Sequence, residues 1–248
     1  DVLVELAEVY FEADGEVELG RPRESPGVLY KQALEIHDGH EQALLGLFRL
    51  HRFNWNRQSR PAVEILAERY QGKRLNRPND LVVKKDGSLW FTDPAFLYGD
   101  KFPGQVRELD EENVYRLDPE TKILSVACAA LKKPNGIAFS QDEQWLYLTD
   151  SMESKIYRCR VDGNRLAEPE VFAEVGFRGI DGLAFDPMGH LWCGTKKGAY
   201  IFSKKGDLLG TLSLGEKVSA FAFHSSENGE TLIAITSKSA AYVGKLKQ

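Results

Sequence analysis

Short apolar runs separated by turns recur along the chain from residue 77 onward. Each copy has an apolar strand, a turn with Asp, Gly or Asn, and a second strand with aromatic or branched residues. Three clear copies and a weaker fourth are "NDLVVKKDGSLWFTDP" (79–94), "NGIAFSQDEQWLYLTDS" (135–151), "DGLAFDPMGHLWCGTKKG" (181–198) and "SAFAFHSSENGETLIAITSKS" (219–239). The pattern therefore predicts a chain of β-hairpins built by internal repetition.

A second hairpin lies between successive copies. Its sequences are "NVYRLDPETKILSV" (113–126), "KIYRCRVDGNRLAEPEVF" (155–172) and "AYIFSKKGDLLGTL" (199–212), each with a tight turn. Four short strands in roughly 40 to 50 residues is the period of a β-propeller blade. A sandwich also has many short strands but lacks this repetition, so we predict a mainly β fold with a partial propeller of about four blades over residues 61–248.

Residues 1–60 follow a different pattern. Apolar and aromatic residues recur at helical spacing at Leu3, Leu6, Ala7, Tyr10, Leu44, Leu47, Phe48 and His51. Ser25 followed by Pro26 predicts a helix start, and the polar segment 13–25 predicts a loop before it. Residues 61–76 fit either a helix or an outer strand. We therefore expect a small α-helical segment over residues 1–60, ahead of the propeller.

Residues 29–51 resemble the junction of two tetratricopeptide repeats through Tyr30, Ala33, Leu44 and Leu47. The resemblance implies a protein partner, or self-association through this segment or through open propeller faces. The alternative is a helical cap that packs on the rest of the chain.

The composition is typical of a globular protein, with 42% hydrophobic and 28% charged residues. A formal net charge of −5 gives no support to nucleic-acid binding, and the sequence has no run of about 18 apolar residues that would indicate a membrane span. Three widely spaced cysteines argue against a disulfide framework or a thiolate zinc site. Nothing resembles a secretory signal, so we expect a cytoplasmic protein.

The three clear copies begin with Asn79, Asn135 and Asp181. In a propeller the innermost strands line a central channel, so equivalent positions cluster around one axis. If the copies are blades, these three oxygen-bearing side chains meet at one end of the channel and suit a hard cation such as calcium or magnesium. A simple turn is the alternative at each single position. The recurrence favours a metal or ligand site.

Three phrases resemble the senescence marker protein/gluconolactonase family, which includes regucalcin: "RPNDLVVKKDGSLWFTDP" (77–94), "KPNGIAFSQDEQWLYLTDS" (133–151) and "GIDGLAFDPMGHLW" (179–192). The resemblance covers residues 62–248. It implies a six-bladed propeller with one divalent cation in the channel and, for many members, hydrolysis of a sugar lactone. The cation implied is calcium, with magnesium, manganese or zinc as alternatives.

The resemblance also implies residue roles. Asn135 and Asp181 match the family's metal ligands, and Asn79 matches a position that reaches the metal or the substrate. Arg77 matches a substrate-contacting arginine, and Glu108 lies near a glutamate that contacts the sugar in some members. In a lactone hydrolase a cation polarises the ester carbonyl and lowers the pKa of a nearby water, while Asp181 is suited to serve as general base.

This sequence departs from the family pattern in two ways. It lacks the Glu-Gly-Pro-type phrase that carries a glutamate ligand, and residues 62–248 are sufficient for about four blades, not six. Two hypotheses follow. The first is a metal-dependent lactone hydrolase, and the alternative is a non-catalytic binding or scaffold protein built from a truncated propeller and a helical arm.

Overall fold

The computed structural model of the chain describes residues 7–9, 16–18, 65–96, 106–225 and 230–246. Strands and turns account for this part of the chain, and none of it is helical. No membrane-crossing helix therefore occurs in these ranges. The chain divides into two compact units, one comprising Glu64–Leu183 and the other the remaining residues.

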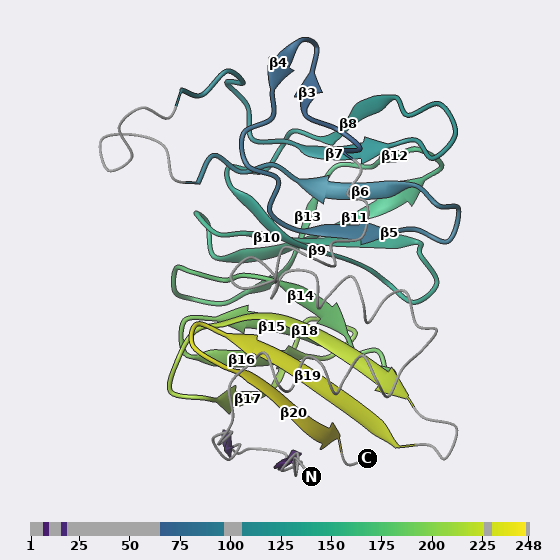
Figure 1. Cartoon of the computed structure of the whole chain (residues 1–248). Helices are drawn as coiled ribbons and strands as arrows, with labels where there is room; N and C mark the ends of the chain where they lie inside the picture. The colour runs from purple at the N-terminus through teal and green to yellow at the C-terminus, as the bar shows by residue number, and fades with distance from the viewer. Residues whose placement is uncertain (1–6, 10–15, 19–64, 97–105, 226–229, 247–248) are drawn as a thin grey trace, which may run out of the picture. The chain divides into compact units, whose positions relative to one another are not determined.

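The first unit contains a short hairpin and two sheets (Figure 1). The hairpin is β3 (Arg69–Tyr70) and β4 (Lys73–Arg74), and the first sheet is β5 (Leu81–Val83), β6 (Leu89–Thr92), β7 (Val114–Leu117) and β8 (Leu124–Cys128). The second sheet is β9 (Pro134–Phe139), β10 (Trp145–Asp150), β11 (Lys155–Asp162), β12 (Arg165–Leu166) and β13 (Glu170–Glu174). Neighbouring strands within each sheet pair antiparallel, and both β12 and β13 pair with β11, so each sheet contains the meander of a propeller blade.

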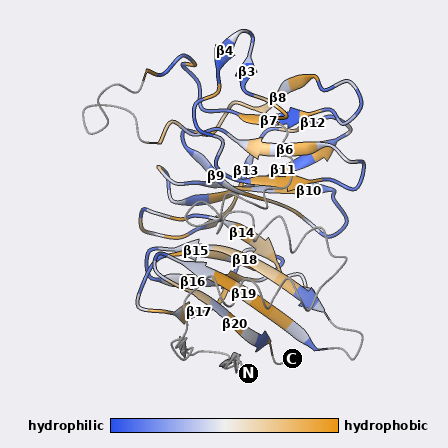
Figure 2. Cartoon of the chain, viewed as in Figure 1, coloured by the Kyte–Doolittle hydropathy of each residue, from blue (hydrophilic) through white to orange (hydrophobic). Residues whose placement is uncertain are grey.

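The two sheets of this unit share one core. Trp90 and Val114 from the first sheet pack with Leu146 and Leu148 from the second, and all four side chains are buried. Figure 2 shows hydrophobic residues along the strands and hydrophilic residues in the turns that join them. Strands that are covered on both faces read as apolar runs rather than as strict alternation, and β7 is an example, because Val114 packs in this core and Tyr115 in another cluster.

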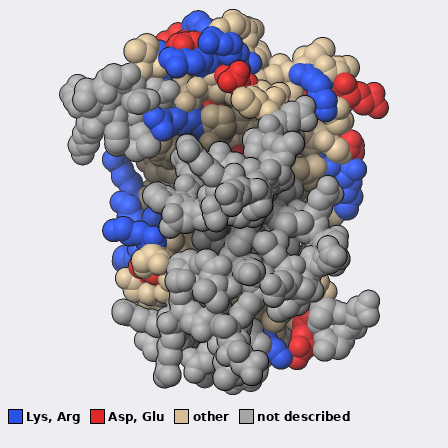
Figure 3. Space-filling model, in the orientation of Figure 1, with Lys and Arg blue, Asp and Glu red and all other residues tan. Residues whose placement is uncertain are grey.

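The β3–β4 hairpin covers part of the other face of the first sheet. Tyr70 lies against Tyr115, with ring centroids 5.1 Å apart, in a cluster that includes Leu75 and Phe91. Figure 3 shows basic and acidic side chains intermixed around this hairpin. The segment 61–76, which fits a helix or an outer strand by sequence, therefore contains a separate hairpin.

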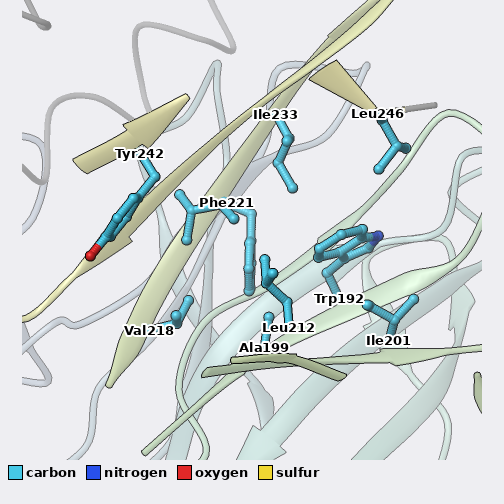
Figure 4. Close-up of a cluster of buried hydrophobic side chains, with 10 residues drawn as sticks. Trp192, Ala199, Ile201, Leu212, Val218, Phe221, Ile233, Tyr242 and Leu246 are labelled. Carbon is cyan, nitrogen blue, oxygen red and sulfur yellow. The ribbon is translucent and has the colours of Figure 1, made fainter. Parts of the chain in front are cut away.

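The second unit repeats the blade topology in two sheets. The first sheet contains β14 (Leu183–Phe185), β15 (Leu191–Thr195), β16 (Gly198–Phe202), β17 (Leu208–Ser213) and β2 (Glu16–Glu18). The second sheet contains β18 (Val218–Ser225), β19 (Thr231–Ser237), β20 (Ala241–Leu246) and β1 (Ala7–Val9). Figure 4 shows their shared core, in which the rings of Trp192 and Phe221 pack edge to face with their centroids 5.9 Å apart. The described residues thus form a mainly β fold with four blade-like sheets, two in each unit.

The prediction of an α-helical segment over residues 1–60 is wrong where the structure describes that segment. Ala7 belongs to β1, which pairs in parallel with β20, and the expected loop contains β2, which pairs in parallel with β17. Both segments satisfy the free backbone groups of a sheet edge, and such long-range pairing overrides helical spacing. The tetratricopeptide-like stretch 29–51 lies outside the described residues, and the domain boundary at residue 60 stays a prediction.

Candidate metal and substrate site

Asn135 lies in β9, at the start of the inner strand of its sheet, and only 5% of the residue is exposed. Its Nδ2 donates to Oγ of Ser151 at 2.9 Å and to the carbonyl oxygen of Ile180 at 3.2 Å. These two bonds fix which end of the amide is nitrogen. Oδ1 is buried without a hydrogen-bond partner. A buried acceptor in this state is costly unless another group, such as a cation, satisfies it.

A threonine connects the first two strand starts. Thr92 ends β6 and is fully buried, and its Oγ1 accepts from the backbone N–H of Asp80 at 3.2 Å. The same hydroxyl donates to the carbonyl oxygen of Asn135 at 2.6 Å, and the Thr92 carbonyl accepts from the backbone N–H of Asn79 at 2.9 Å. Thr92 therefore holds the backbone at Asn79 and at Asn135.

Thr149 repeats this arrangement one blade later. It lies fully buried in β10, where the pairing with β9 shifts register between Leu148 and Asp150. Its Oγ1 accepts from the backbone N–H of Gly136 at 2.6 Å and donates to the carbonyl oxygen of Asp181 at 3.0 Å. The backbones at Asn79, Asn135 and Asp181 are thus joined in series by hydrogen bonds through two threonines.

Gly136 permits a close approach of the second and third strand starts. A Cβ at this position would lie 2.3 Å from the carbonyl oxygen of Asp181 and 2.8 Å from Cα of Gly182. Both are backbone atoms, so no side chain can move aside. Glycine at position 136 is therefore required by the packing of backbone on backbone, in addition to any turn preference.

Arg77 and Asn79 lie in the segment that leads into β5. Asp93 fixes this segment, because its Oδ2 accepts from the N–H of Asn76 at 2.8 Å and its Oδ1 from the N–H of Arg77 at 2.7 Å. Burial raises the pKa of Asp93 to about 6, although these two bonds act in the opposite direction. The side chain of Asn79 is exposed and that of Arg77 half-buried. Their contact with a substrate stays a prediction.

Glu108 lies against the β3–β4 hairpin. Its Oε2 accepts from the backbone N–H of Arg74 at 2.7 Å, and its Oε1 accepts from Nε of the same residue at 2.5 Å. Arg69 approaches to 3.6 Å. The Arg74 backbone N–H, followed by its guanidinium, holds the pKa of Glu108 below its usual value. Both carboxylate oxygens therefore interact with these arginines. A contact between Glu108 and a sugar stays a prediction.

The arrangement suits a hard cation better than a soft one. The predicted ligands Asn79, Asn135 and Asp181 offer amide and carboxylate oxygens, and the unpartnered Oδ1 of Asn135 is an acceptor of the kind that calcium uses. Among the described residues no group of three His, Cys, Asp or Glu side chains is placed to hold a metal. Convergence of the three predicted side chains on one ion stays a prediction.

Sequence reasoning missed Thr92, Thr149 and Ser151. The signal was present in the sequence, because Thr-Asp follows the second apolar run in both of the first two copies, as Thr92-Asp93 and Thr149-Asp150. The aspartates share a role as well as a position. Asp150 accepts from the backbone N–H of Lys132 at 2.7 Å, as Asp93 does from Asn76 one blade earlier.

Comparison of the chain with known proteins identifies its family. The family model described as the SMP-30/Gluconolactonase/LRE-like region matches residues 11–239. The chain belongs to this family. Among its relatives in the family, the gluconolactonase of Zymomonas mobilis is 33% identical over 181 residues, which cover 68% of this chain and 50% of the relative.

Two further members have similar overlap. A 6-deoxy-6-sulfogluconolactonase of Pseudomonas putida is 28% identical over 182 residues, covering 71% of this chain and 59% of the relative. The solved structure of a gluconolactonase from Xanthomonas campestris matches with a TM-score of 0.63 and 34% identity, covering 71% of this chain and 59% of that one. The chain spans half of the length of the Zymomonas relative and 59% of the length of each of the other two.

Proposed function

We propose that the protein hydrolyses a sugar lactone with the help of one divalent cation, calcium in the first instance. Its relatives include proteins named gluconolactonase and 6-deoxy-6-sulfogluconolactonase. The observation that carries the proposal is the buried Oδ1 of Asn135, which lacks a protein donor although its amide nitrogen is fully engaged. Such an oxygen fits a metal ligand.

In this proposal Asn135, Asp181 and Asn79 hold the cation. When bound, a divalent cation supplies Lewis acidity toward the lactone carbonyl and lowers the pKa of a bound water. The Asp181 carboxylate accepts a proton from the attacking water, whose oxygen forms a bond to the carbonyl carbon. The ring C–O bond then breaks, and the proton passes to the departing alkoxide.

Arg77 and Asn79 have the complementary task of binding the substrate. The guanidinium of Arg77 presents donors in a planar fork that matches a carbonyl or neighbouring hydroxyls. The backbone bonds from Asn76 and Arg77 to Asp93 hold this segment in place. The substrate is therefore a small, hydroxyl-bearing lactone.

The test compares wild type with Asp181→Asn in gluconolactone hydrolysis, with calcium, magnesium, manganese or zinc supplied singly. Asp142→Asn is the matched control, because Asp142 lies in the exposed β9–β10 turn and accepts from Ser140 and Gln144. Loss of a general base predicts a fall in turnover of about 100-fold or more for Asp181→Asn. Asp142→Asn should retain activity.

Turnover that survives both Asp181→Asn and a chelator would reject the site. Cation binding without turnover of any sugar lactone would favour the alternative, a binding protein that has kept the metal site of its family. The two readouts are independent, so calorimetry and activity must both be recorded.

A further inference from the structure

Ser151 follows β10 and contacts the side chain of Asn135 directly. Its Oγ accepts from Nδ2 of Asn135 at 2.9 Å and donates to the carbonyl oxygen of Ile180 at 2.8 Å. That carbonyl oxygen also accepts from Nδ2 of Asn135 at 3.2 Å. Three groups therefore form a closed triangle of hydrogen bonds, which we call the amide lock: the Asn135 amide, the Ser151 hydroxyl and the Ile180 carbonyl.

Each hydrogen bond of the amide lock has a defined donor and acceptor. The hydroxyl hydrogen of Ser151 points to Ile180, so Oγ faces Asn135 as an acceptor. Both partners of the amide are then acceptors, and only its nitrogen can satisfy them. If the amide turned over, its oxygen would face the Ile180 carbonyl oxygen, and Ser151 could donate to it only by giving up its own bond to that carbonyl. Oδ1 is thereby kept on the opposite side, where it has no protein partner.

We propose that Ser151 is a positioning residue, which fixes the Asn135 amide with Oδ1 toward the cation site. The inference rests on the proposed function, because it assigns a use to that oxygen. Ser151 itself does not contact the cation or the substrate in this scheme. Its contribution is to remove the competing orientation of the amide before a cation binds.

The blade fold itself does not require this hydroxyl. The corresponding residue after Thr-Asp in the first copy is Pro94, and in the third copy Lys197 stands two residues after Thr195. Both copies form a second blade strand, β6 and β15, without a serine at this position. The hydroxyl is found in the one copy, of these three, whose strand starts with the buried Asn135.

The test measures Ca²⁺ binding by isothermal titration calorimetry for wild type, Ser151→Ala and Ser151→Thr. Loss of one hydrogen bond that favours the binding orientation predicts about 5-fold weaker Ca²⁺ binding by Ser151→Ala. Ser151→Thr keeps the hydroxyl and should bind within about twofold of wild type. The side-chain NH₂ signals of Asn135 in nuclear magnetic resonance should also exchange faster with solvent in Ser151→Ala.

Ser140→Ala is the matched control. Ser140 lies between β9 and β10, donates to Asp142 at 2.6 Å and accepts from the N–H of Trp145 at 3.1 Å, so its removal costs similar bonds without touching Asn135. Urea unfolding measures the loss of stability in both alanine variants. We expect comparable losses of stability but weaker Ca²⁺ binding only in Ser151→Ala.

The outcomes separate the two proposals. Wild-type Ca²⁺ affinity in Ser151→Ala, or equal weakening in Ser140→Ala, would overturn the role of Ser151 while leaving the cation site intact. A wild-type protein that binds no Ca²⁺, or binding that survives Asp181→Asn unchanged, would overturn the proposed function and this inference with it.

Discussion

Replacing Thr149 by valine should destabilise the first unit more than replacing it by serine. Valine has nearly the shape of threonine but cannot hydrogen bond, whereas serine keeps the hydroxyl and loses one methyl group. Thr149 is fully buried, and its Oγ1 joins the N–H of Gly136 to the carbonyl oxygen of Asp181. The pair of variants therefore separates the hydroxyl from the methyl group.

The expected magnitudes follow from these contacts. In Thr149→Val the Gly136 N–H and the Asp181 carbonyl both lose their partner, at about 1–3 kcal/mol for each buried group. Asp181 is half-buried and water can replace part of its loss, so about 2–4 kcal/mol is expected in total. Thr149→Ser removes one buried methyl group, at about 1 kcal/mol. The serine variant should thus be more stable by about 1–3 kcal/mol.

Equilibrium unfolding in urea, followed by tryptophan fluorescence, measures this difference through the midpoint at constant slope. Hydrophobic burial alone predicts the opposite order, because valine buries more apolar surface than serine. If Thr149→Val equals or exceeds Thr149→Ser in stability, the hydroxyl does not join the strand starts in the way described. Ca²⁺ titration of both variants would then show equal affinity as well.

Two further predictions concern neighbouring positions. Gly136→Ala should lower the free energy of unfolding by about 3 kcal/mol or more, because the alanine Cβ would lie 2.3 Å from the carbonyl oxygen of Asp181. A melting temperature within a degree or so of wild type would contradict this expectation. Asp93 has a pKa raised to about 6 by burial, above its value of about 3.9 in an unfolded chain, so the native state binds the extra proton. The free energy of unfolding, measured by urea unfolding at each pH, should therefore fall by up to about 3 kcal/mol as the pH rises from about 4 to above 6. Asp93→Asn should lack this dependence of stability on pH.

The strands could be predicted because their signals are local. Asp86-Gly87 and Asp162-Gly163 stand between apolar runs, and both glycines have positive φ in the turns that join neighbouring strands, +83° and +57°. The repeat length then indicated blades. The pairing of β1 with β20 and of β2 with β17 could not be predicted in this way, because it depends on sheet edges more than 190 residues away in the chain.

The candidate site shows the same division. Recurrence singled out Asn79, Asn135 and Asp181, since each stands at the same place in its copy. The two threonines also recur, but their role exists only between blades: Thr92 donates to a carbonyl 43 residues ahead, and Thr149 to one 32 residues ahead. Glu108 illustrates the converse, because its main partner, Arg74, lies 34 residues back on a hairpin that the sequence pattern did not reveal.

The forward direction of the threonine bonds has an evolutionary consequence. In each of the first two repeats, the hydroxyl that fastens the following repeat is encoded within the repeat that precedes it. A duplicated or deleted blade therefore includes the threonine that bonds to the following blade, and the hydrogen bonds between the other blades stay unchanged. This property is expected of modules that contact only their neighbours. Proteins built on this plan can change their number of blades by copying whole units, without redesigning the contacts that remain.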